Sequence, residues 1–366
     1  MAAAPPPAQT GDMGVGDVGR CEPSARPPTE EERAAAAAVL QMIWGLHISR
    51  AVYVVAELGI ADMLASGPMT AAELARATRA HEPSLYRVLR LLASLGVLTE
   101  DNACSFGLTV LGDRLRADAP ASMRSWARLT DSIGGVRSFD PIVETVRTGK
   151  PGLDIAYGMS GFQFLAAHPE QAQGFQAAMS ERTAAFAPGL AAGYDFSAAR
   201  TVADIGGGAG TLLAAILHEH GHLRGVLFDR PEVTSRAPGV LAAAGITDRC
   251  EVVAGDFFAG VPDGADVYVL ANVLHDWDDA RSVRILANCR KAMAADGRVL
   301  IVERLIPDDP ADAVNVLLSD INMLVVTGGM ERTNAQYAGL LTQAGLAPGR
   351  VRPVTAPYGV IEGTAS

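Results

Sequence analysis

The sequence predicts an α/β fold built on a doubly wound, parallel sheet, and three observations support this. A short apolar run at residues 201–205 meets a glycine-rich turn that contains Gly206 and Gly208, and helix formers follow it. Further strand-like runs at 223–229, 250–258, 265–271 and 297–303 alternate with helical segments. Each run ends in, or leads into, a polar residue, and these are Asp204, Asp229, Asp256, His275 and Glu303. Because parallel strands share one carboxyl rim, we expect the ligand site there.

Composition limits the class of protein. The chain has 366 residues, enough for two domains, and no apolar run long enough to span a bilayer. Its net charge of −11 argues against nucleic acid or an anionic membrane as partner. The four cysteines form no Cys-x-x-Cys pair and no secretory signal is evident, so we expect reduced thiols and a cytoplasmic protein.

The first 118 residues divide into a tail and a helical unit. Residues 1–30 are rich in Ala, Pro and Gly, and we expect them to be disordered. Residues 31–60 have apolar side chains at helical spacing. A capping box at Thr70 and Glu73 then begins a helix, a second helix at 83–95 ends at Gly96, and 97–106 reads as a hairpin. Two helices and a hairpin predict a winged-helix unit over 31–118.

A winged helix is also compatible with a DNA-binding regulator. Four arginines, Arg76, Arg79, Arg87 and Arg90, are available to contact phosphates. The second helix, however, has a leucine-rich stripe, and the whole chain is acidic. We therefore favour a role in dimerisation and in covering the substrate site.

Two later segments offer candidate acceptor-binding residues. Residues 119–194 are expected to form a helical connector, and Met159, Phe162, Phe175 and Met179 in it are large and apolar. Such side chains either pack in the core or line a ligand pocket. Residues 312–326 and 333–343 are predicted helices before two closing strands. Asn322 and Met323, on the first of these helices, face either the acceptor or the core.

Six motifs, taken in order, resemble the S-adenosylmethionine-dependent small-molecule O-methyltransferases, such as plant caffeate and flavonoid enzymes and bacterial polyketide-tailoring enzymes. They are Asp-Ile-Gly-Gly-Gly-Ala-Gly at 204–210, Phe-Asp-Arg-Pro at 228–231, Gly-Asp-Phe-Phe at 255–258, His-Asp-Trp at 275–277, Val-Glu-Arg at 302–304 and Gly-Gly-Met-Glu-Arg-Thr at 328–333. The resemblance implies a Rossmann-like methyltransferase domain at 195–366, a dimerisation domain at 31–118, a connector at 119–194 that lines the acceptor pocket, and a homodimer in which the 31–60 region is exchanged.

The resemblance also implies where S-adenosylmethionine binds. The methionine part is expected against Gly206 and Gly208, beside Asp204, and Asp229 is expected to accept from the ribose hydroxyls. Asp256 is expected to accept from the adenine amino group, with Phe257 against the ring face. Many relatives have Lys or Arg four residues before the histidine; Ala271 stands there in this chain, so its contact is expected through backbone alone.

Methyl transfer to a hydroxyl requires a group that takes the proton. His275 is the candidate, because a positioned imidazole accepts a phenolic proton as the new bond forms. The resemblance implies that Glu303 or Glu331 orients the ring, and the residues alone do not choose between them. Asp276 is expected to help orient the acceptor. We expect no metal: His218, His220 and His222 are close in sequence, but Gly221 interrupts the helix and no further ligand completes the set.

The predicted function is methylation of a phenolic or enolic hydroxyl of an aromatic natural product, in a homodimer without nucleic-acid or membrane partners. The richness in Ala and Arg is typical of proteins from high-GC bacteria, and we therefore expect a bacterial secondary metabolite as the acceptor. Two alternatives remain open: decarboxylation or hydroxylation on the same scaffold, and a winged-helix regulator that senses a small ligand.

Overall fold

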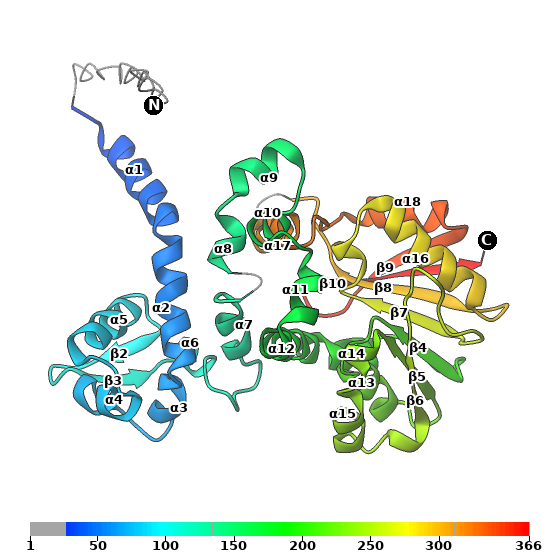
Figure 1. Ribbon diagram of the computed structural model, residues 1–366, viewed down its shortest axis with the longest axis horizontal. Coiled ribbons are helices and arrows are strands. Elements are labelled where there is room, and N and C mark those ends of the chain that lie inside the picture. The colour runs from blue at the N-terminus through cyan, green and yellow to red at the C-terminus, as the bar shows by residue number, and fades with distance from the viewer. Residues whose placement is uncertain (1–26, 133–134, 310–311, 366) are drawn as a thin grey trace, which may run out of the picture. The chain divides into compact units, whose positions relative to one another are not determined.

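The computed structural model describes residues 27–132, 135–309 and 312–365. The chain divides into two compact units, residues 1–46 and 47–366. The predicted disordered tail lies almost wholly outside the described residues. In the first unit, helix α1 (Glu30–Ile43) starts at a capping box in which Thr29 and Glu32 exchange hydrogen bonds, and none of its residues is buried (Figure 1). Met42 and Ile43, which belong to the predicted apolar stripe, are 78% and 65% exposed.

Near its start the second unit contains the two predicted helices and the predicted hairpin. Helices α2 (Gly45–Glu57) and α3 (Ile60–Leu64) precede β1 (Met69–Thr70), α4 (Ala71–Thr78), α5 (Glu82–Ser94), β2 (Leu98–Glu100) and β3 (Ser105–Leu108). The strands form a small sheet of order β1-β3-β2. Thr70 and Glu73 form the predicted capping box, and Val55, Leu74, Leu89 and Phe106 pack in one core with no exposed surface.

The connector is helical, as predicted. After α6 (Val110–Asp113) it comprises α7 (Arg124–Leu129), α8 (Val136–Phe139), α9 (Ile142–Thr148), α10 (Gly152–Tyr157), α11 (Gly161–Ala167) and the long α12 (Pro169–Gly193). The last of these helices contacts α13 extensively, and its C-terminal half carries the buried residues Phe186 and Leu190. The boundaries proposed for the three domains remain a prediction.

The remaining chain forms a seven-stranded sheet of order β6-β5-β4-β7-β8-β10-β9. Its strands are β4 (Thr201–Ile205), β5 (Arg224–Asp229), β6 (Cys250–Ala254), β7 (Val267–Ala271), β8 (Arg298–Arg304), β9 (Leu346–Pro353) and β10 (Tyr358–Ala365). The first five are parallel, as predicted. The closing pair differs, because β10 runs antiparallel to both β8 and β9.

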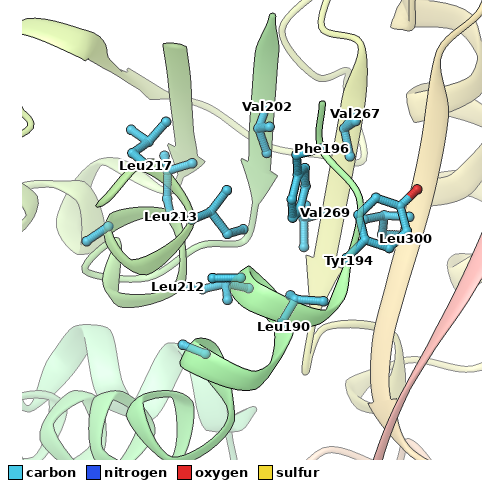
Figure 2. Packing of buried hydrophobic residues seen from close by; sticks show 14 of the residues in the cluster. Leu190, Tyr194, Phe196, Val202, Leu212, Leu213, Leu217, Val267, Val269 and Leu300 are labelled. Carbon is cyan, nitrogen blue, oxygen red and sulfur yellow. The ribbon is translucent and has the colours of Figure 1, made fainter. Parts of the chain in front are cut away.

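Side chains alternate between two buried faces of this sheet, as expected for period-two strands. One face packs against α12, α13 (Thr211–Glu219) and α15 (Ala237–Ala243), with Val202, Val269 and Leu300 in the cluster drawn in Figure 2. The other face packs against α16 (Asp279–Ala292) and α18 (Asn334–Gln343), which lie together in Figure 1. The doubly wound prediction is confirmed. Short helices α14 (Pro231–Thr234) and α17 (Val314–Val326) complete the second unit.

Two further observations concern expectations from composition. In the described part of the chain Cys104, Cys250 and Cys289 are free thiols, and Cys21 lies outside it. Among the described helices none is by itself both long and apolar enough to cross a bilayer, whereas α1 and α2 together meet that test by length and composition alone.

Candidate active site

The turn between β4 and α13 presents backbone at the carboxyl rim of the sheet. Gly206 and Gly208 have φ angles of +71° and +62°, which residues with a side chain adopt only at an energetic cost. The Gly206 N–H donates to the carbonyl of Phe228 at 2.8 Å, and a Cβ at Gly206 would approach Val273 Cγ2 to 2.9 Å. At Gly208 the same position is open space, so a ligand is able to lie against this backbone.

Two acidic side chains flank the turn. Asp229, at the end of β5, accepts from the N–H of Gly208 at 2.9 Å and from its neighbour Arg230 at 2.7 Å. Asp204, at 1% exposure, has one carboxylate oxygen with no hydrogen-bond partner among the described residues. Burial, with the charge of Asp229, raises the pKa of Asp204 to about 7, and burial also raises the pKa of Asp229.

An aromatic cluster stands beside the turn. The Trp277 ring stacks on Phe162 with centroids 5.5 Å apart, and Phe257 and Phe258 contact Trp277 edge to face. The Arg230 guanidinium lies 4.8 Å from the Phe162 ring centroid. Phe162 therefore lies next to the residue that follows Asp229, on the side of the site where the ribose was predicted.

A cavity of about 1690 Å³ joins the glycine turn to His275. All seven predicted cofactor residues line it: Asp204, Gly206, Gly208, Asp229, Asp256, Phe257 and Ala271. Six of the predicted acceptor residues also line it: Phe162, Phe175, Met179, Asp276, Asn322 and Met323. The structure thus brings most of the predicted site residues to one cavity.

Met159 is the exception, because it is not among the residues that line the cavity. It follows Gly158, whose φ of +72° ends α10, and it packs against the buried cluster of Leu153, Phe164 and Leu165. In this structure Met159 therefore packs against the connector core and does not line the cavity.

His275 lies in a short 3-10 turn (Leu274–Asp276) that follows β7, and it is 2% exposed. Its Nδ1 lies 2.8 Å from Glu303 Oε2 and 3.9 Å from Glu331 Oε2. The nearer pair meets the distance of an ion pair but not the direction of an aligned hydrogen bond. Of the two candidate orienting carboxylates, Glu303 is therefore the one in contact with the ring.

Glu303 also holds the turn that carries His275. Its Oε1 accepts from the backbone N–H groups of Val273 and Leu274 at 3.0 and 2.9 Å, and more weakly from that of His275. Glu331 is fixed separately: the Ser319 hydroxyl donates to its carboxylate at 2.7 Å, and burial raises its pKa. One carboxylate thus sets both the backbone of the turn and the position of the imidazole.

The charges around His275 determine its protonation. Burial on its own would lower the pKa of the ring, but the carboxylates of Glu303, Asp276 and Glu331 outweigh it and raise the pKa to about 9. Asp276 Oδ1 lies 3.8 Å from Nε2, and its side chain keeps 24% of its surface exposed. The nitrogen nearer the cavity residue Asp276 is therefore Nε2, while Nδ1 faces Glu303.

The composition of this cluster also resembles a metal site. One ligand atom each from His275, Glu303 and Glu331 lies within 4.8 Å of the others. The 2.8 Å between Nδ1 and Oε2 is shorter than the separation of about 3.3 Å between two ligands of a tetrahedral zinc ion. In the other histidine group, His220 and His222 contact the backbone carbonyls of Ala191 and Phe196 through Nε2.

Several cavity residues were not predicted from the sequence to contact a ligand. Trp277 and Asn272 line the cavity, and Asn272, with a φ of +55°, accepts from the Tyr358 hydroxyl at 3.1 Å. Arg182 on α12 lines it too. Arg182 stands three residues after the predicted Met179, so helical spacing alone would have placed both on one face.

Comparisons with known proteins identify the family of this chain. A family model for the O-methyltransferase domain matches residues 139–347, and one for the O-methyltransferase dimerisation domain matches 40–118. The phenazine O-methyltransferase of Lysobacter antibioticus is 43% identical over 91% of this chain and 98% of its own length. The aclacinomycin 10-hydroxylase of Streptomyces purpurascens is 37% identical over 84% of each chain.

Solved structures give the same result. The mitomycin 7-O-methyltransferase superposes with a TM-score of 0.87 at 40% identity, over 93% of this chain and all of the other. The neocarzinostatin-pathway O-methyltransferase, solved with S-adenosylmethionine and 2-hydroxy-5-methyl naphthoic acid, has a TM-score of 0.78 at 37% identity, over 89% of this chain and 98% of the other. The chain belongs to the S-adenosylmethionine-dependent O-methyltransferase family.

Proposed function

We propose that this protein methylates a phenolic or enolic hydroxyl of an aromatic natural product and that His275 takes the hydroxyl proton. One observation carries the proposal: the glycine turn after β4 and the imidazole of His275 line the same cavity, and the buried carboxylate of Glu303 lies 2.8 Å from that imidazole. A glycine turn between a strand and a helix is typical of nucleoside cofactor sites. An imidazole oriented by a carboxylate is typical of groups that accept a proton.

The residues of the rim fit S-adenosylmethionine. Gly208 leaves backbone accessible beside the start of α13, Gly206 lines the same cavity, and Asp229 has acceptor capacity beyond its two backbone partners. Asp204, Asp256 and Phe257 complete the proposed set. When bound, this cofactor supplies a methyl group that is already activated, so the protein has to align the acceptor and remove its proton.

The acceptor end is apolar enough for a flat ring. Phe175, Met179 and Met323 line the cavity there, and methionine adapts to aromatic faces at small energetic cost. Asn322 and Asp276 are the polar groups that we assign to orienting the hydroxyl. A mainly apolar wall with a few polar groups is typical of small-molecule pockets.

Proton transfer from the acceptor hydroxyl to His275 is easier when the pKa values of the two groups are similar. A phenol has a pKa of about 10 and an unperturbed histidine one of about 6.5, a gap of roughly 5 kcal/mol. With the pKa of His275 raised to about 9, the gap falls to about 1.4 kcal/mol. Glu303 keeps a proton on Nδ1, which leaves Nε2 free to accept from the acceptor hydroxyl.

The same raised pKa sets a pH dependence. Below about 9 the imidazolium predominates, so only about one molecule in a hundred has a neutral ring at pH 7. Because the neutral ring is the base, turnover per encounter is expected to increase as pH rises toward 9.

We also propose that the protein acts as a homodimer in the cytoplasm. The dimerisation-domain match at residues 40–118 supports the first part, as do the exposed apolar side chains of α1. The free thiols Cys104, Cys250 and Cys289 favour a reducing compartment. Sedimentation velocity measures the mass of the particle and would contradict the dimer if a monomer predominated at micromolar concentration.

Hydroxylation is the second candidate, because the hydroxylase relative shares the scaffold. Mass spectrometry distinguishes the two: methylation adds one carbon and two hydrogens, and hydroxylation adds one oxygen.

The test is methyl transfer from cofactor with a radioactive methyl group to a panel of phenols, with wild type, His275→Ala and His275→Asn. We expect product from wild type and a loss of about 10²- to 10⁴-fold in both variants. Calorimetry with S-adenosylhomocysteine is the control and should give unchanged affinity. Transfer that survives in both variants would remove the assignment of the base.

A further inference from the structure

One cation in the acceptor half of the cavity has no anionic partner among the described residues. Arg182, on α12, lines the cavity, and its Nε is inaccessible and has no hydrogen-bond partner. Across the described ranges, the Arg182 side chain forms no hydrogen bond and no ion pair within 4.0 Å; its guanidinium carbon lies 5.8 Å from the centre of the Trp126 ring. Arg182 is only partly exposed, and a guanidinium whose Nε is desolvated without a hydrogen-bond partner is stabilised by an anion, so this position favours an anionic ligand.

The position of Arg182 is fixed by its neighbour in sequence. Glu181 accepts from both the hydroxyl and the backbone N–H of Ser125, at 2.6 and 3.1 Å, and this joins α12 to the start of α7. Trp126 follows Ser125, and Arg182 follows Glu181. The joined helices therefore present an indole face and a guanidinium to the same cavity, which suits an aromatic ring with an acidic substituent.

The charge environment assigns Arg182 to the end of the cavity near the base. Asp276, whose Oδ1 lies 3.8 Å from His275 Nε2, is within electrostatic range of Arg182, which opposes the effect of burial on the pKa of that carboxyl. The two side chains do not pair within 4.0 Å, so both remain available to a ligand. Arg182 thus shares a neighbour with the base.

We infer that Arg182 binds a carboxylate on the acceptor, so that the acceptor class is a hydroxylated aromatic carboxylic acid. This inference rests on the proposed function and narrows its substrate. The planar guanidinium matches a carboxylate with two parallel hydrogen bonds. Trp126 provides a face for the ring, and the hydroxyl is then directed toward His275 and Asp276.

A carboxylate reaches this cavity from two sources, because the methionine part of the cofactor also has one. The two sources predict different kinetics. If Arg182 binds a carboxylate of the acceptor, replacing it should raise the acceptor KM and reduce the preference for an acid over its amide. If Arg182 binds the carboxylate of the cofactor, replacing it should weaken cofactor binding whichever acceptor is used.

The experiment uses the full-length protein and isomeric hydroxynaphthoic acids, each paired with its own carboxamide. Comparing acid with amide of one isomer keeps ring size and hydroxyl position constant. The variants are Arg182→Met, which keeps length but removes charge, and Arg182→Lys. Arg128→Met is the matched control, since Arg128 lies on α7, is 52% exposed and pairs with Glu57.

For at least one isomer we expect wild type to prefer the acid by about 10- to 100-fold in kcat/KM, the range for a hydrogen-bonded charge pair. Arg182→Met should reduce that ratio to within about threefold, mainly through loss of acid turnover, while the Kd of S-adenosylhomocysteine stays within about twofold. Arg182→Lys should keep part of the ratio, and Arg128→Met all of it. An acid preference that is absent in wild type, or that persists in Arg182→Met, overturns the inference.

Two further outcomes separate this inference from the proposed function. If Arg182→Met weakens S-adenosylhomocysteine binding more than tenfold and leaves the acid-to-amide ratio unchanged, the carboxylate bound is that of the cofactor and the inference is wrong. If wild type methylates no panel member, the proposed function fails on that panel. Calorimetry then still tests Arg182, by measuring how the acid and the amide bind to the complex of the protein with S-adenosylhomocysteine. The inference is supported if wild type binds the acid more tightly than the amide and Arg182→Met loses this preference. It is overturned if wild type binds both equally or binds neither.

Discussion

Replacing Glu303 by Gln removes one charge and keeps the shape of the side chain. The pKa of His275 is about 9 against an ordinary value of 6.5, which corresponds to a net stabilisation of the imidazolium by about 3 kcal/mol. Glu303, at 2.8 Å, is the nearest carboxylate in this balance and its largest favourable contribution. Without that charge the burial of the ring prevails, so the pKa of His275 is expected to fall below its ordinary value.

The amide also reverses the tautomer. Three backbone N–H groups, of Val273, Leu274 and His275, point at Oε1 of Glu303, so the oxygen of the Gln amide must take that position. Its NH₂ group then faces Nδ1 of His275 and donates to it. The ring proton moves to Nε2, and the nitrogen proposed as the base is no longer able to accept.

The assay is kcat/KM for methyl transfer as a function of pH in wild type and Glu303→Gln. We expect a loss of about 10²- to 10⁴-fold, the range for losing an oriented base, and an inflection that moves from near 9 to below neutral. Glu331→Gln is the matched control. Glu331 lies 3.9 Å from Nδ1, so a smaller loss is expected. The reasoning would be refuted if folded Glu303→Gln protein had a kcat/KM within threefold of wild type and an unchanged pH inflection.

Three other outcomes are expected. Asp276→Asn removes a carboxylate 3.8 Å from Nε2, so the alkaline inflection of kcat/KM should move down by about one pH unit; an upward shift or none in the pH profile would contradict it. Gly206→Ala combines a φ of +71° with a Cβ 2.9 Å from Val273. It should lower Tm and weaken S-adenosylhomocysteine binding by about tenfold, which melting curves and calorimetry check. Chelation with EDTA should leave activity unchanged, because the 2.8 Å between His275 Nδ1 and Glu303 Oε2 is shorter than the separation of two ligands on a zinc ion; activity lost to EDTA and restored by zinc would be the opposite result.

Local patterns were sufficient for much of the fold and the rim of the site. The glycine turn, the acids at strand ends and the capping box at Thr70 are each set by a few neighbouring residues. Because parallel strands end on one rim, Asp204, Asp229 and Asp256 could be grouped without knowing the strand order. The antiparallel β10 could not be deduced in this way, since its pairing depends on contacts between segments far apart in sequence.

The choice between Glu303 and Glu331 needed the sheet register. Ala271 pairs with Val302 across β7 and β8, so the next residue along β8, Glu303, lies beside the turn that carries His275. No spacing within the sequence contains that information. The packing of Met159 against Leu153, Phe164 and Leu165 likewise depends on contacts that no local spacing contains.

The most direct measurement of the central claim is ¹⁵N NMR of the histidine rings as a function of pH, with His275→Asn to assign the signal among the seven histidines. Labelled protein bound to S-adenosylhomocysteine is the right sample, because it holds the cofactor site filled while no reaction occurs. We predict a ring that keeps its proton on Nδ1 and loses the one on Nε2 with a midpoint in the alkaline range. A midpoint at or below 6.5, or a neutral ring with its proton on Nε2, would contradict the account.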